Sequence, residues 1–145
     1  MAREFGTYNV TVPMGVTWEE SITLTDANGV AINLTGYDIR AQIRTERRPE
    51  RDDDTGLAVN DPVMEITTVD YYDSDPAWTL VEGFVNDDPT SGTFTMTVAA
   101  VDTWGLSPDN SKLKLYWDIR LVNTVTGYSI PVVAGSVTAL PGTTI

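Results

Sequence analysis

Three acidic clusters are the residues of this chain whose types and spacing could do chemistry. They are Asp52-Asp53-Asp54, the group Asp70, Asp73 and Asp75 around Tyr71 and Tyr72, and the pair Asp87-Asp88. Carboxylates on one loop can bind Ca²⁺, which takes several oxygen ligands, and two carboxylates across a cleft can hydrolyse a glycosidic bond. The spacing from Asp70 to Asp75 lacks the EF-hand pattern and its closing Glu, so solvated loop tips are the favoured interpretation.

The residue types that are missing narrow the chemistry further. The chain has no Cys and no His, which excludes disulfides, thiolate zinc sites and any Ser-His or Cys-His catalytic pair. The glycines are scattered among turns and form no phosphate-binding loop. We therefore expect no catalytic residue, no cofactor and no metal ion, and a protein that is not an enzyme.

The charge of the chain is strongly negative and unevenly placed. A net charge of −12 over 145 residues argues against nucleic acid as a partner, and neither a membrane-spanning apolar run nor a secretory signal is expected. Five of the nine basic residues lie between Arg40 and Arg51, whereas Asp52 to Ser111 holds thirteen carboxylates and no Lys or Arg. Two interpretations remain open: a solvated acidic surface, or complementary patches that dock neighbouring subunits.

Alternating apolar and polar residues indicate strands. The segments Tyr37–Arg44 and Leu113–Leu121 alternate over their whole length, as expected for half-buried strands with one face on the core and a polar outer face. Residues 17–25 form another strand, followed by the turn Asp26-Ala-Asn-Gly29. We therefore predict that Val16–Arg44 is one continuous β-hairpin.

The rest of the chain repeats this pattern. Further strands are predicted over residues 4–12, 61–69, 78–85, 93–98 and 128–137, with one short helix within 98–106. The prediction is a single all-β domain, 1–145, built as an antiparallel β-sandwich of about seven to nine strands with long loops; a closed barrel is the alternative. Residues 45–60 are predicted as a charged, exposed loop or hairpin tip, and 139–145 as a flexible or partner-bound tail.

Two features concern the core. Trp18, Trp78 and Trp117 are in phase with aliphatic residues, which favours core positions over a sugar-stacking platform. The motif Tyr37-Asp-Ile-Arg40 recurs as Trp117-Asp-Ile-Arg120. We interpret this echo as two strands in similar packing roles, or as chance.

Several motifs resemble a family of phage proteins. They are Tyr8–Val12, Gly15–Trp18, Leu24–Gly29, Ile32–Tyr37 and Ala41–Arg44, and, at the far end, Thr93–Val98 and Tyr116–Leu121. Together they resemble the N-terminal domain of tailed-bacteriophage baseplate upper proteins and related short virion proteins. The resemblance covers both ends of the chain and is poor across residues 45–88. It implies an Ig-like fold and a role in assembling part of a virion.

The expected function is that of a non-enzymatic bacteriophage virion structural protein, assembled in the host cytoplasm. Its expected partners are other virion proteins and further copies of itself, in the tail or baseplate or as a capsid cement or decoration protein. A carbohydrate- or receptor-binding module is the alternative of a different class. The interface candidates are Arg44, Arg47, Arg48, Arg51, Asp52, Asp53, Asp54, Tyr71 and Tyr72.

Overall fold

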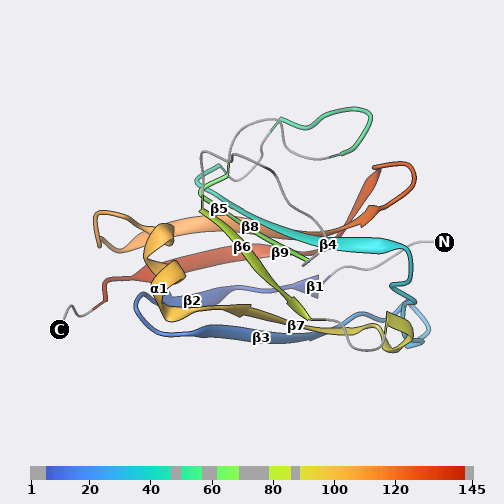
Figure 1. Ribbon diagram of the computed structural model, residues 1–145, viewed down its shortest axis with the longest axis horizontal. Coiled ribbons are helices and arrows are strands. Elements are labelled where there is room, and N and C mark those ends of the chain that lie inside the picture. The colour runs from blue at the N-terminus through green and yellow to red at the C-terminus, as the bar shows by residue number, and fades with distance from the viewer. Residues whose placement is uncertain (1–5, 47–49, 57–61, 69–78, 86–88, 143–145) are drawn as a thin grey trace.

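The computed structural model describes residues 6–46, 50–56, 62–68, 79–85 and 89–142. These residues form mostly β-strands, which confirms the all-β prediction (Figure 1). The strands are β1 (Gly6–Thr7), β2 (Val10–Pro13), β3 (Trp18–Thr23), β4 (Tyr37–Arg44), β5 (Met64–Thr68), β6 (Thr79–Val85), β7 (Thr93–Val98), β8 (Leu113–Asn123) and β9 (Ser129–Leu140). The helical turns are η1 (Pro89–Ser91), α1 (Ala100–Thr103) and η2 (Trp104–Leu106).

The strands are arranged in two layers joined through β6. Hydrogen bonding follows the order β1-β9-β8-β4-β5-β6-β7-β3, and β2 also pairs with β9. The path bends at β6, so that β7 and β3 lie across the molecule from β8 and β4 (Figure 1). The pairing is not purely antiparallel, because β1 and β2 run parallel to β9 and β5 runs parallel to β6.

The prediction of a single hairpin over Val16–Arg44 is wrong, although both of its strands exist. β3 pairs with β7, and β4 pairs with β5 and β8. The Asp26 carboxylate closes the intervening turn by accepting hydrogen bonds from the backbone N–H groups of Asn28 and Val30. Only the bridge Thr25↔Ala31 follows, after which the chain crosses to the other layer. Alternation identifies a strand but carries no information about its partner.

The core lies between the layers and is apolar. On β4 the residues Ile39, Ala41 and Ile43 are buried, as the alternation predicts. Trp18 on β3 and Trp117 on β8 meet across the two layers with ring centroids 5.4 Å apart. This confirms the core positions of these two tryptophans, whereas Trp78 lies outside the described residues.

The C-terminal end of β9 is packed more firmly than predicted. Ala139 is fully buried within β9, and the backbone of Gly142 exchanges two hydrogen bonds with the side chain of Asn110, at 2.8 and 3.2 Å. Residues 139–142 are therefore part of the fold, and residues 143–145 of the predicted flexible or partner-bound tail lie outside the described residues. Within the described part of the chain, no helix has the length and apolar character needed to cross a membrane.

Candidate functional site

The outer face of β4, β5 and β8 carries polar side chains that are removed from water. Cross-strand pairing places Arg120 opposite Arg40, and Asp118 opposite Gln42. Gln42 in turn stands opposite Glu65 on β5. The buried polar residues here are Arg40, Gln42, Arg44, Glu65, Thr67, Asp118, Arg120 and Ser129, each with less than a tenth of its surface exposed. We call this set the polar ladder.

The burial of this face contradicts the expectation of half-buried strands with a polar face toward water. The segment 50–56 lies over the end of the ladder formed by Arg120 and Ser129, because the carbonyl of Thr55 accepts hydrogen bonds from the N–H and the hydroxyl of Ser129, at 2.7 and 2.6 Å. Gly56 has a φ of +74°, and a Cβ there would stand 3.1 Å from Nη2 of Arg120. Within the predicted loop, residues 50–54 are therefore exposed to solvent, whereas Thr55 and Gly56 pack on the sheet.

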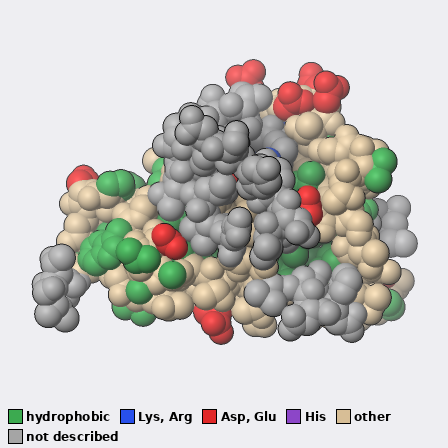
Figure 2. Space-filling model, viewed as in Figure 1, with side chains coloured by type: hydrophobic (Ala, Val, Ile, Leu, Met, Phe, Trp, Pro, Cys, Tyr) green, Lys and Arg blue, Asp and Glu red, His purple; other side chains and the backbone are tan. Residues whose placement is uncertain are grey.

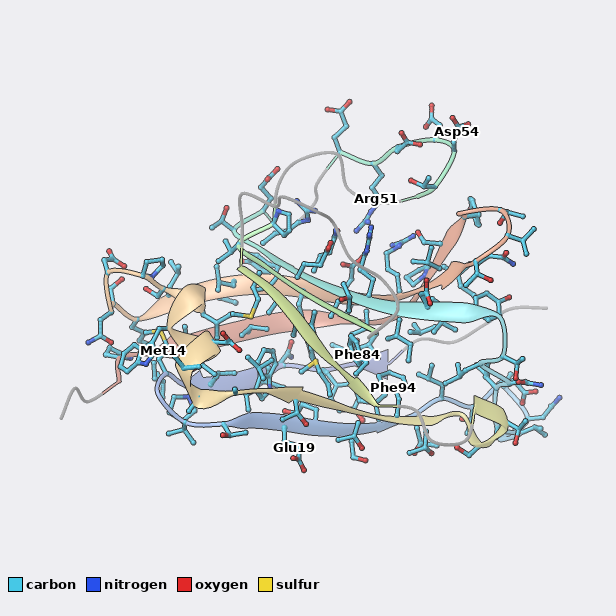
Figure 3. The ribbon with its side chains drawn as sticks, in the orientation of Figure 1. Met14, Glu19, Arg51, Asp54, Phe84 and Phe94 are labelled. Atoms are coloured by element: carbon cyan, nitrogen blue, oxygen red, sulfur yellow. The ribbon has the colours of Figure 1, made fainter. Side chains whose placement is uncertain are left out.

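One carboxylate fastens this segment to the sheet. Oδ2 of Asp118 accepts hydrogen bonds from Arg51 at 3.1 Å and from Arg120 at 3.2 Å. Arg51 also donates to the carbonyl of Gly56, and Arg120 donates to the hydroxyl of Ser129. We call Arg51, Asp118 and Arg120 the Asp118 clamp (Figure 3 shows Arg51 reaching from the segment toward the sheet).

A second chain of contacts crosses from β5 to β4. Oε2 of Glu65 accepts a hydrogen bond from Gln42 at 2.6 Å and lies 3.5 Å from Nε of Arg40. Gln42 uses its other amide atom to accept a hydrogen bond from Arg44 at 2.8 Å. These hydrogen bonds link the side chains of the ladder to one another, whereas Oε1 of Glu65 is buried with no hydrogen-bond partner among the described residues.

The arginines of the ladder keep their charge despite burial. Burial lowers the pKa of the Arg44 and Arg120 guanidinium groups, and the negative charge of Asp118 opposes that shift in both. Guanidinium nevertheless stays protonated in proteins at neutral pH. The ladder and the clamp together therefore hold four guanidinium groups, from Arg40, Arg44, Arg51 and Arg120, against the two carboxylates of Glu65 and Asp118.

A hollow of about 510 Å³ opens beside the clamp. Its wall on β9 contains Gly135, where a Cβ would collide with the carbonyl of Tyr8. That carbonyl accepts a hydrogen bond from Nε1 of Trp117 at 2.9 Å, so glycine lets the N-terminal segment close the wall. The hollow is lined by Thr7, Asn9, Gln42, Arg44, Glu46, Arg51, Lys114, Tyr116, Trp117, Asp118, Ala134, Gly135 and Ser136.

The arrangement suits binding through charge and hydrogen bonds. Oδ2 of the Asp118 carboxylate is already engaged by two arginines of the same chain. Within the described ranges, no three carboxylates come together as a metal site would require. The hollow has the size of a ligand pocket, but its lining is polar.

The predicted interface residues fall in different surroundings. Arg44 is buried in the ladder, and Arg51 is held by Asp118 of its own chain. Asp52 turns its carboxylate back to accept hydrogen bonds from the N–H groups of Asp54 and Thr55. Asp53 and Asp54 are exposed, and Asp54 lies at the crest of the segment (Figure 3). Arg47, Arg48, Tyr71 and Tyr72 lie outside the described residues, as do the cluster Asp70–Asp75 and the pair Asp87-Asp88.

The residues at the centre of this site are absent from the sequence-based candidates. Asp118, Arg120 and Glu65 sit in alternating strands, where a polar residue is expected to face water. One signal was available, because the echoed motif places Asp118 and Arg120 in the same pattern as Asp38 and Arg40. β4 and β8 prove to be antiparallel neighbours, with the two motif arginines directly opposite.

Comparisons with known proteins add no identification. No model of a known protein family matches the chain, and no curated protein is found to be similar in sequence.

Proposed function

We propose that this chain is a non-enzymatic structural protein of a tailed-bacteriophage virion that binds other virion proteins as an oligomer. One observation carries the proposal: the buried charges of the polar ladder fix a projecting acidic turn on a rigid two-layer scaffold. Rigid elements that present charged loops suit a protein that is held by its neighbours. The motifs that resemble baseplate upper proteins lie between residues 8 and 44 and, at the far end of the chain, on β7 and β8, and they support the same role.

The strand order supports an Ig-like sandwich as the finer description of the fold. β3, β7 and β6 follow the connectivity of strands B, E and D, while β9, β8, β4 and β5 follow that of G, F, C and C′. In antibody domains a disulfide joins strands B and F. This chain has no Cys, and the contact between Trp18 and Trp117 joins the corresponding strands.

Two placements in the virion are proposed, the tail or baseplate and the outside of the capsid. The test is to purify particles that contain the chain, separate tails from capsid shells, and measure the copy number of the chain in each fraction by quantitative mass spectrometry. A fixed copy number in the tail fraction supports the first placement, and one in the shell fraction supports the cement or decoration role. Absence of the chain from purified particles would overturn the proposal.

A further inference from the structure

We infer that the hollow beside the Asp118 clamp receives the Asp53-Asp54 turn of a second copy of this chain. The contact would be two-fold symmetric, each copy giving its turn and receiving its partner's. The inference rests on the proposed assembly function and names the surface through which copies associate.

The lining of the hollow favours a carboxylate. Three cations line it, Arg44, Arg51 and Lys114, against the carboxylates of Glu46 and Asp118. Asp118 is already shared by two guanidinium groups. Among the described residues that line the hollow, the cations therefore outnumber the carboxylates by one, in a chain whose net charge is −12.

The side chains at the rim of the hollow also favour a carboxylate ligand. Lys114 is exposed and forms no ion pair with any described residue, and its ammonium group lies 5.8 Å from the ring centroid of Tyr116. Oδ1 of Asn9 accepts hydrogen bonds from the N–H and the hydroxyl of Ser136. The remaining amide nitrogen of Asn9 can only donate. A ligand that supplies negatively charged acceptor oxygens fits this rim.

The acidic turn is already shaped for such a contact. Asp52 caps it from within through the N–H groups of Asp54 and Thr55, and Arg51 fastens its base to the sheet. The carboxylates of Asp53 and Asp54 are left exposed, with no hydrogen bond or ion pair to a described residue. A turn ordered before binding loses less conformational entropy on association than a flexible one. Carboxylates gather at the top of the molecule in the view of Figure 2.

The positions of turn and hollow permit a closed pair. Arg51 connects the turn to the hollow, since it lies at the base of the Asp53-Asp54 turn and also lines the hollow. A projection beside a hollow on one face becomes self-complementary when a second copy is rotated about a two-fold axis between them. Each copy then contributes the carboxylates of Asp53 and Asp54 to the hollow of the other.

The test is sedimentation velocity of the full chain over a range of concentrations at about 0.15 M salt, which shortens the repulsion between the two acidic copies to about 8 Å. We expect a concentration-dependent dimer. Lys114→Asp and Asp54→Lys should each weaken the association constant at least about tenfold, because each places like charges in contact. The combined variant, Lys114→Asp with Asp54→Lys, should restore most of the loss.

Two matched controls carry the same change of charge away from the contact. Lys112→Asp alters an exposed lysine that does not line the hollow, and Glu19→Lys alters an exposed carboxylate pointing away from the crest (Figure 3). Both should leave association within about twofold of the parent. All the altered residues are exposed, so thermal melts of the variants should match that of the parent.

Three outcomes would overturn the inference: a chain that stays monomeric, a dimer indifferent to Lys114→Asp, or a combined variant that fails to recover. None of these outcomes would change the result of the virion fractionation, which tests whether the chain is bound to other virion proteins. A chain absent from virions that still forms this dimer would overturn the proposed function alone.

Discussion

The two faces of the paired strands β4 and β8 both bury side chains, yet different interactions hold them. The inner face packs Ile43, Trp117 and their neighbours against the opposite layer. The outer face buries Arg40, Arg44 and Arg120, and the segment 50–56 lies over Arg120 and Ser129. Each face contains side chains that are less than a tenth exposed, so burial alone does not distinguish a hydrophobic core from a polar one.

The difference between the faces lies in what each contributes. Burial of apolar surface stabilises the fold by about 25 cal/mol per Å², in any arrangement that keeps water out. A buried ion pair adds little net stability, because desolvation of the charges offsets their attraction, but removing one partner is costly. The inner face therefore supplies most of the stability, and the outer face fixes the position of one surface segment.

The largest effect is expected on the inner face. Trp117→Ala removes a side chain that is 3% exposed and contacts Trp18 across the layers. We expect the free energy of unfolding to fall by about 3–5 kcal/mol, measured by urea denaturation. Trp117→Phe should lose less, since it keeps an aromatic ring. A near-neutral Trp117→Ala would contradict the assignment of this face as the core.

The second largest loss of stability is expected when the central carboxylate of the Asp118 clamp is removed. Asp118→Ala leaves the buried Arg120 without its carboxylate, and we expect a loss of about 3 kcal/mol. Replacing both residues, Asp118→Leu with Arg120→Met, should recover much of this loss, because an apolar pair needs no charge partner. If the double variant proves as unstable as the single one, the ladder contributes stability in its own right and the contrast between the faces is smaller than described.

A smaller effect is expected at the rim of the clamp. The Arg51 side chain is 34% exposed, and solvent screens its ion pair, so Arg51→Ala should cost only about 1 kcal/mol. A more specific effect of Arg51→Ala is expected where the segment 50–56 meets β9. Hydrogen exchange at the N–H of Ser129, which donates to Thr55, should accelerate as the segment opens. Unchanged exchange there would show that the segment is held by other contacts.

The smallest effect concerns a carboxylate outside both faces. Hydrogen bonds from the hydroxyls of Ser107 and Ser111 lower the pKa of Asp109 below 3.8, its ordinary value. The linked stabilisation is present above that pH and is lost as the pH falls through the lowered pKa. Asp109→Asn should therefore flatten the pH dependence of unfolding below about pH 4. An identical slope in both proteins would contradict this linkage.

More of the fold than of the candidate site could be predicted from the sequence. Strand positions, turns and the inner face of β4 follow from alternation and turn chemistry, which are local properties. The site depended on pairings between distant segments. Arg44 and Arg51 were identified as candidates for contacts with a neighbouring subunit, and their observed partners Gln42 and Asp118 belong to the same chain. Glu65 and Asp118 were passed over because nothing local shows that a covering segment lies above them.

What the sequence by itself determined is the set of strands and the side of each strand that is apolar, because side chains alternate along an extended backbone whatever its partner. Only the tertiary structure decided which strands pair, that β3 and β4 belong to different layers, and that the polar face of β4 and β8 is covered. The physical reason is that a buried charge needs its counter-charge and hydrogen bonds close by, and here these come from residues far apart in the chain, such as Arg51 and Asp118.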